Sequence, residues 1–548
     1  MQATLEKGCG AAKTSTAAIP QSDANGVLDS GRTRLTDAVV RNDGATLKRL
    51  LRAPDIHINL QDSLGCLALV EACRVGSLEC ISLLLAHPEV DVNLPDRQAA
   101  TPLVSAIIHG KRSGHVITRT LLGRGDIDVN RVSLGQTPLE TAADTQDSEA
   151  TSLLLGHPDI GVNRRGDAGG TPLEKACKVR CEAVALQLLA RHDLEDATVP
   201  LHLACLWGNT KVVEAMLTRQ CLVITHPNEV VSPLHAAASS GHHEVVALLL
   251  KDPRVSVNAV RYDGESPLYG ACRNKHLKVI QLLLEDPRTD VNLTTDESTT
   301  PLYLASRKGD DRLVVMLLRH PRIDPSIPRT DGSTPFFIAC QKGHAPVVHC
   351  LLGSRVVDIN TPMKDGATPF YIACQNGHVD VVRSLLRDPR THVSRPRNDG
   401  ATPLFIGCQK GHLDIVRLLI SDPRVTDLNT SMDVGISPFS VSCGQGNSMV
   451  AKLLIASGLP LDIYYPIDKD HLLKSATIID DWKHMVQAIP GSNIVARQLA
   501  EHQGFTSLGE LIDSFEMDPV LTRQKARVEL GLAGEFMFGS CFQLFFAH

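Results

Sequence analysis

The chain has 548 residues, of which 43% are hydrophobic, 21% are charged and only 4% are aromatic. This length exceeds what a single hydrophobic core supports, so the chain forms either several domains or a linear array of stacked units. The composition excludes a collagen-like or wholly disordered chain, and a formal net charge of -6 gives no overall reason to expect nucleic acid or an anionic membrane as a partner.

The amino-terminal segment, residues 1–30, is rich in small and polar residues, and we predict that it is disordered. It contains no apolar run long enough for a signal peptide, and no part of the sequence reaches the roughly 18 consecutive apolar residues of a membrane-spanning helix. With 15 cysteines and no export signal, the chain is expected in the reducing cytoplasm, with the nucleus as a second location, and without membrane insertion. Two glycosylation sequons, at Asn292 and Asn429, are interpreted as chance matches.

From residue 34 onward the sequence repeats itself with a period close to 34 residues. A proline marks the same position in eleven copies, and Arg34 and Ala68 occupy it in two degenerate copies before them. Eight of the twelve intervals are 34 residues, and the others are 36, 28, 33 and 35. Such regularity predicts a solenoid of stacked units. The prolines are Pro102, Pro138, Pro172, Pro200, Pro233, Pro267, Pro301, Pro335, Pro369, Pro403 and Pro438.

Each copy has the pattern of two short helices followed by a long finger, as residues 365–390 illustrate. Thr368 and Pro369 suit the start of a helix, because threonine caps the free N–H groups and the missing N–H of proline costs nothing there. Gly377 predicts that this first helix ends after about eight residues. Pairs of valine and leucine four residues apart predict a second helix with one buried stripe, which an Asp-Pro dipeptide ends.

These residues resemble the ankyrin repeat family, in thirteen copies from about Gly31 to Ile463. The family's Thr-Pro-Leu-His and Gly-His signatures stand almost unchanged at Ser232–His235 and Gly241–His242. The resemblance implies an all-α solenoid of helix-turn-helix units with projecting fingers, used to bind other proteins. The chain departs from the family where the glycine after the first helix is replaced, by Asn42, Gln146, Arg180 and Lys275.

The repeats and their flanks divide the chain into four predicted segments. The interval from Pro172 to Pro200 is six residues shorter than the usual 34, and we place a boundary between two subarrays there. The segments are a disordered stretch (1–30), a first subarray of degenerate copies (31–196), a second subarray (197–463) and a helical carboxy-terminal cap or tail (464–548). In the tail, helices are predicted at 480–489, 507–515 and 518–531.

No residue pattern typical of catalysis or metal binding occurs in a suitable context, so we predict a chain that is not an enzyme and has no catalytic residue, cofactor or metal. Eight cysteines share the position five residues after the proline frame, and we interpret them as small core residues. The histidines that follow the helix-ending glycines are interpreted as structural hydrogen-bonding groups. The cysteines are Cys73, Cys177, Cys205, Cys272, Cys340, Cys374, Cys408 and Cys443.

The sixth and seventh residues after the proline are expected to face a concave groove lined by the first helices. In five successive copies these positions carry long basic or amide side chains, which suit an acidic or backbone-rich segment of a protein partner. Ordinary solvated surface charge is the alternative interpretation. With Trp207, at the seventh position of the short copy, the predicted partner-binding residues are Arg273, Asn274, Arg307, Lys308, Gln341, Lys342, Gln375, Asn376, Gln409 and Lys410.

The second residue after the proline is aromatic in the same five copies, and we interpret this row as packing between first helices rather than as a ligand surface. The row consists of Tyr269, Tyr303, Phe337, Tyr371 and Phe405.

The sequence as a whole predicts a monomeric, non-enzymatic scaffold or adaptor that holds a partner protein along residues 261–420 and binds no nucleic acid. In the alternative hypothesis, the tail recruits regulatory machinery, such as a ubiquitin ligase, to the bound client. A catalytic unit within the tail is less favoured, because the tail lacks a nucleophile–base or metal-binding pattern.

Overall fold

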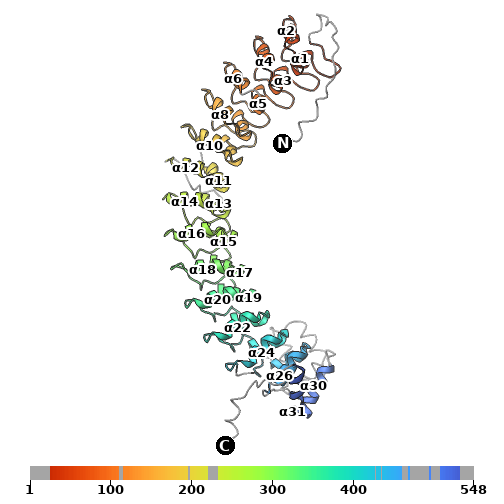
Figure 1. Ribbon diagram of the computed structural model, residues 1–548, viewed down its shortest axis with the longest axis vertical. Helices are drawn as coiled ribbons and strands as arrows, with labels where there is room; N and C mark the ends of the chain where they lie inside the picture. Colours follow the sequence, from red (N-terminus) through yellow and green to blue (C-terminus); the bar gives the residue numbers. More distant parts are fainter. Residues whose placement is uncertain are drawn as a thin grey trace. The chain divides into compact units, whose positions relative to one another are not determined.

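The structure is a computed structural model that describes residues 25–109, 115–195, 198–219, 232–425, 428–432, 435–458, 467–468, 493–494 and 506–530. These residues form 28 helices and one pair of two-residue strands. The first 26 helices make thirteen consecutive pairs, which confirms both the predicted all-α repeat fold and the predicted number of copies (Figure 1). We refer to the odd-numbered member of each pair as the first helix and to the even-numbered member as the second helix.

The chain divides into two compact units, residues 1–256 and 257–548. The first unit contains seven helix pairs: α1 (Arg34–Val40) and α2 (Gly44–Leu50), α3 (Ala68–Val75) and α4 (Leu78–Leu85), α5 (Pro102–His109) and α6 (Val116–Leu122), α7 (Pro138–Asp144) and α8 (Ser148–Leu155), α9 (Pro172–Lys178) and α10 (Glu182–Leu189), α11 (Thr198–Trp207) and α12 (Thr210–Leu217), α13 (Pro233–Ser240) and α14 (His243–Lys251).

The second unit contains six helix pairs and the tail elements. They are α15 (Pro267–Asn274) and α16 (Leu277–Glu285), α17 (Pro301–Lys308) and α18 (Asp311–Leu318), α19 (Pro335–Lys342) and α20 (Ala345–Gly353), α21 (Pro369–Gln375) and α22 (Val379–Arg387), α23 (Pro403–Lys410) and α24 (Leu413–Ser421), α25 (Pro438–Gly444) and α26 (Ser448–Ala456), β1 (Ile467–Asp468), β2 (Asn493–Ile494), α30 (Thr506–Met517) and α31 (Pro519–Glu529).

Helix packing continues through the short copy. The boundary predicted between residues 196 and 197 lies inside the first unit, where α11 packs against both α9 and α13. The shortening falls between the end of α10 at Leu189 and the start of α11 at Thr198, so it shortens a finger and leaves both helices of the copy in place.

The first helices start and end as the local sequence predicts. At α21 the Thr368 hydroxyl accepts a hydrogen bond from the Tyr371 N–H (3.1 Å), and Pro369 is the first helical residue. At α19 the helix ends at Gly343, whose φ of 74° lies in the left-handed region. The residues that replace this glycine elsewhere adopt the same conformation, with φ of 53°, 55°, 59° and 63° at Asn42, Gln146, Arg180 and Lys275.

The core lies between the paired helices and between neighbouring pairs. All eight cysteines of the shared position are at most 1% exposed, which confirms them as core residues. Burial raises the pKa of the Cys73 and Cys177 thiols to about 12, so both remain protonated at neutral pH. The aromatic row is also buried, with Tyr269 the most exposed member at 8%, and the interpretation of this row as packing is confirmed.

Asparagine side chains in eight fingers couple one copy to the next, a feature that the sequence analysis missed. The Asn292 amide donates to the Arg322 carbonyl (2.8 Å) and accepts from the Asp324 N–H (2.9 Å). The Asn292 sequon is therefore part of the inter-repeat hydrogen bonding. The same two bonds to the following copy are made by Asn25, Asn59, Asn93, Asn130, Asn163, Asn258 and Asn360.

Arginines that follow the second helices add a further link between copies. Arg390 pairs with Asp388 (2.7 Å) and donates to the Leu352 carbonyl near the end of α20 (2.8 Å). A guanidinium is favourable at this position, because the free carbonyls of a helix end carry partial negative charge. The hydrogen bond from Arg390 lowers the pKa of the Asp388 carboxyl. Arg254 and Arg424 make equivalent contacts.

In the described part of the tail, two helices follow the last repeat, and the second of them packs on it. α31 packs against α26 and α30, and Lys452 of α26 pairs with Glu529 of α31 (2.5 Å). Asp518 caps α31 by accepting from the Leu521 N–H (3.0 Å), which matches the helix predicted at 518–531. The helix predicted at 480–489 lies outside the described residues. The antiparallel pairing of β1 with β2 was not predicted from the helical pattern of the tail.

Candidate functional site

Ten of the eleven predicted partner-binding residues lie at the carboxyl ends of first helices in the second unit. Each of α15, α17, α19, α21 and α23 packs against the next, so their last turns form a row along this unit (Figure 1). We refer to these ten residues as the stripe; they are Arg273, Asn274, Arg307, Lys308, Gln341, Lys342, Gln375, Asn376, Gln409 and Lys410.

Exposure alternates along the stripe with repeat position. The seventh-position residues, from Asn274 to Lys410, are all exposed. The sixth-position residues are half-buried except for Arg307, which is exposed. The stripe therefore presents an outer edge of exposed cations and amides beside an inner edge of partly covered side chains.

Several stripe residues are already engaged by the fold. Arg273 pairs with Glu265 of the preceding finger (2.5 Å). The Lys308 ammonium donates to the Arg273 carbonyl (2.6 Å), and the Asn376 amide donates to the Gln341 carbonyl (2.8 Å). Lys308 and Asn376 thus bridge neighbouring first helices, whereas Arg273 ties α15 to the finger that precedes it.

The remaining cations of the stripe are open to a ligand. Arg307, Lys342 and Lys410 are exposed and form neither an ion pair nor a side-chain hydrogen bond with any residue that the structure describes. The side-chain amides of the half-buried sixth-position residues are likewise unbonded within the described ranges; these residues are Gln341, Gln375 and Gln409.

The electrostatic environment at one end of the stripe is positive. Desolvation lowers the pKa of Lys308, and repulsion from Lys275, Arg273 and Arg307 lowers it further. Asp310, which pairs with Lys275 (3.1 Å), acts in the opposite direction. An anion placed beside the ends of α15 and α17 would relieve this repulsion.

Histidines of the Gly-His signature hold the backbone beneath the stripe. The Nε2 atoms of His344, His378 and His412 lie 3.1, 2.9 and 3.0 Å from the carbonyl oxygens of the preceding copy. Those carbonyls belong to Arg307, Gln341 and Gln375, all at the sixth position. The predicted structural role of these histidines is confirmed.

Trp207, the eleventh predicted residue, belongs to the first unit and is half-buried at the end of α11. The guanidinium of Arg180, one of the residues in place of a helix-ending glycine, stands 4.3 Å from its ring centroid. This cation–π contact covers part of the ring and couples two neighbouring copies.

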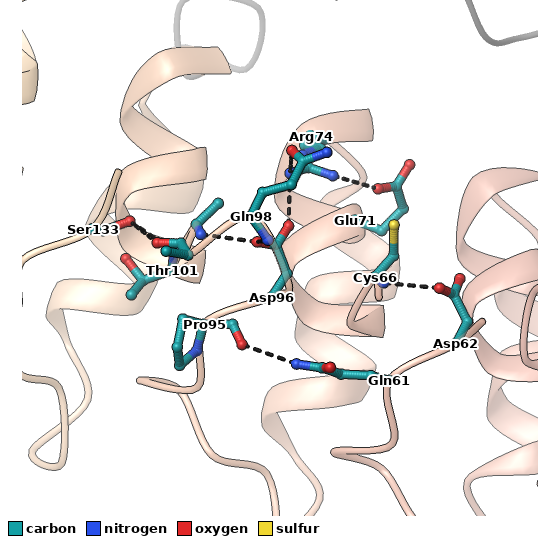
Figure 2. Close-up of polar contacts among 12 residues, drawn as sticks. Gln61, Asp62, Cys66, Glu71, Arg74, Pro95, Asp96, Gln98, Thr101 and Ser133 are labelled. Atoms are coloured by element: carbon teal, nitrogen blue, oxygen red, sulfur yellow. Dashed lines mark hydrogen bonds and ion pairs between the residues drawn. The ribbon is translucent and has the colours of Figure 1, made fainter. Parts of the chain in front are cut away.

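In the first unit, the basic residue at the sixth position of α3 is neutralised. Figure 2 shows the Arg74 side chain directed at two carboxylates: it pairs with Asp96 at 2.7 Å and with Glu71 at 3.4 Å. Asp96 is nearly inaccessible and also accepts from backbone N–H groups of its own finger. Arg74 is therefore a structural group, unlike Arg307.

The first unit has exposed apolar side chains that the sequence analysis missed. In the early copies, Ile108 stands at the sixth position and Val75 at the seventh, and their side chains are 38% and 40% exposed. In the fingers, Leu64 is 57% and Leu134 is 47% exposed. This part of the chain differs from the polar stripe of the second unit.

A metal-binding cluster and a membrane-spanning helix are both absent from the described part of the chain. Over those residues, no three histidine, cysteine, aspartate or glutamate side chains are grouped as a metal would require. No helix within the same ranges has both the length and the apolar character that crossing a membrane demands.

Comparison with known proteins gives the family. The profile described as "Ankyrin repeats (3 copies)" matches residues 35–133 and, in overlapping segments, residues 183–430, which together exceed half of the chain.

Three relatives are similar over parts of their length. The ankyrin repeat protein YahD of Escherichia coli (strain K12) is 33% identical over 116 residues, 21% of this chain and 58% of that protein. Rabankyrin-5 of Homo sapiens is 26% identical over 247 residues, 40% of this chain and 20% of that protein. The SMC5-SMC6 complex localization factor protein 1 of Bos taurus is 36% identical over 142 residues, 25% of this chain and 13% of that protein. The chain thus matches less than two thirds of each relative, and by its repeats it belongs to the ankyrin repeat family.

Proposed function

We propose that this chain is a non-enzymatic scaffold that binds a segment of a partner protein along the stripe. The observation that carries the proposal is the row of exposed cations without a partner among the described residues: Arg307, Lys342 and Lys410. Arg74, which has the same repeat position in the first unit as Arg307 in the second, is by contrast paired with two carboxylates. The scaffold acts by positioning its client, and the buried thiols suit a reducing compartment, the cytoplasm or nucleus.

Stabilisation of the helices does not by itself account for the presence of these cations. Arg307, Lys342 and Lys410 stand in the last turns of their helices, where a positive charge interacts favourably with the helix dipole. That interaction contributes roughly 0.3–1 kcal/mol at an exposed site. Neutral substitutions should therefore leave the fold intact, which allows binding to be tested separately from folding.

The test is capture of proteins from a cell lysate by the full chain and by two matched triple variants. The stripe variant is Arg307→Gln, Lys342→Gln and Lys410→Gln. The control variant is Lys278→Gln, Arg312→Gln and Arg383→Gln, which removes three charges from exposed positions of the second helices α16, α18 and α22. We expect the stripe variant to lose specific proteins about ten-fold and the control variant to retain them. The loss should be reproduced by raising the salt concentration.

Equal capture by both variants would contradict a binding role for the stripe. It would favour the second candidate function, in which the tail recruits another protein. Exposed apolar side chains in the tail support this candidate. Met517, Val520 and Val528 are 89%, 71% and 65% exposed on α30 and α31. Loss of the same proteins from a Val520→Ser and Val528→Ser variant, with the stripe intact, would support that second candidate.

A further inference from the structure

We propose that the segment held by the stripe is an extended acidic peptide that runs along the first helices with a carboxylate every third residue. This inference rests on the proposed function and adds the conformation of the bound segment and the spacing of its charges. It follows from three features of the second unit: the separation of the open cations, the chemistry of the amides beside them and the burial of the aromatic row.

The open cations lie on three different first helices, Arg307 at the sixth repeat position and Lys342 and Lys410 at the seventh. Arg307, Lys342 and Lys410 stand on α17, α19 and α23, and Asn376 occupies the corresponding place at the end of α21. Packed helices lie about 8–10 Å apart. An extended peptide in the polyproline II conformation advances about 3.1 Å per residue with three residues per turn, so three residues match one repeat and every third side chain faces the same way. Carboxylates at i, i+3 and i+9 would therefore face the three cations, with residue i+6 beside Asn376.

The amides favour an extended peptide over a helix. Gln341, Gln375 and Gln409 recur once per repeat, directly before the exposed edge of the stripe. A carboxamide both donates and accepts hydrogen bonds. It can therefore pair with the N–H and C=O groups of an extended peptide, which are free, whereas those of a helix are already bonded to each other. A helical partner would also need about seven residues per repeat, because a helix advances only 1.5 Å per residue.

Polar contacts must carry the binding, because the aromatic row supplies no anchor. Phe337 and Phe405 are each 1% exposed, and the Tyr303 hydroxyl is hydrogen-bonded to Ser333 (3.1 Å). The positive environment around Lys308 adds long-range attraction for an acidic segment. We therefore expect binding that is selective for the spacing of charge and sensitive to salt.

Three fluorescent peptides test the proposal with the full chain at low salt, by fluorescence anisotropy. The first consists of five Glu-Gly-Ser units. The second has the same composition with all its glutamates adjacent, and the third is an alanine-rich helical peptide with glutamate at every seventh residue. We expect the first peptide to bind about five-fold or more tightly than either of the others.

Three variants of the chain test which stripe side chains contact the peptide. The Arg307→Gln, Lys342→Gln and Lys410→Gln variant should lose the preference for spaced glutamates. A Gln341→Ala, Gln375→Ala and Gln409→Ala variant should weaken binding of the first peptide while keeping its salt dependence. The Lys278→Gln, Arg312→Gln and Arg383→Gln control, with the same charge loss as the first variant, should bind like the unmodified chain.

The outcomes separate this inference from the proposed function. Equal binding of spaced and clustered glutamates, or tighter binding of the helical peptide, would overturn the extended register. If lysate capture depends on the stripe but none of the peptides binds, the scaffold function stands and the inference is wrong. If neither capture nor peptide binding depends on the stripe, both are wrong.

Discussion

Replacement of Gly343 by alanine is expected to lower the free energy of unfolding by about 2–4 kcal/mol. Gly343 ends α19 with a φ of 74°, a conformation that disfavours residues with a side chain. An added Cβ would also collide with the ring of His378 from the next copy. That ring is held by its bond to the Gln341 carbonyl (2.9 Å), so it cannot move without loss of a contact between copies.

Gly76→Ala is the matched control for this prediction. Gly76 ends α3 with a φ of 80°, but a Cβ added there meets nothing within 4 Å. The Gly76→Ala substitution should therefore lower the free energy of unfolding only by the conformational penalty, about 1–2 kcal/mol. Urea-induced unfolding followed by circular dichroism measures both shifts. Equal losses for the two variants would show that the packing of His378 against Gly343 contributes nothing.

Phe337→Ala should destabilise the chain by about 3–5 kcal/mol, because it leaves a cavity between first helices. The Phe337 side chain is 1% exposed, so its removal deletes buried contact area and exposes no new binding surface. The unfolding midpoint in urea measures the loss. Below the unfolding transition, the folded fraction should still capture the same partners, because the stripe residues are unchanged.

Lys342→Ala, five residues further along the same helix, is the control for this comparison. Its side chain is exposed, and substitution should change stability by no more than about 0.5 kcal/mol. The opposite pattern, in which Phe337→Ala abolishes capture without destabilising the chain, would mean that the aromatic row is a ligand surface.

Much of the fold was predictable because short-range chemistry determines it. Thr368 and Pro369 fix the start of α21 through a cap and a preset φ, and Gly343 fixes the end of α19 through its left-handed conformation. Arg180 and Lys275 adopt that conformation although they are not glycines. The packing of neighbouring copies therefore sets the backbone even where the local sequence opposes it.

Whether each stripe side chain is paired or open was not predictable in the same way, because this depends on the residues of the adjacent finger. Arg273 and Arg307 share a repeat position, yet Arg273 is paired with Glu265, whereas the corresponding finger residue before α17 is Thr299. The asparagine bonds between fingers were also missed, since each joins residues about one period apart, such as Asn292 and Arg322. A pattern that describes one copy contains no information on these contacts.

Site-specific photo-crosslinking in cell lysate tests the central claim most directly. A photo-reactive benzoylphenylalanine replaces Asn376 within the stripe in one full-length variant and Arg383 on the second helix α22 in another. Binding along the stripe predicts salt-sensitive protein adducts from position 376 and none from position 383. Adducts that form only at position 383, or equally at both positions, would contradict a partner-binding role for the stripe.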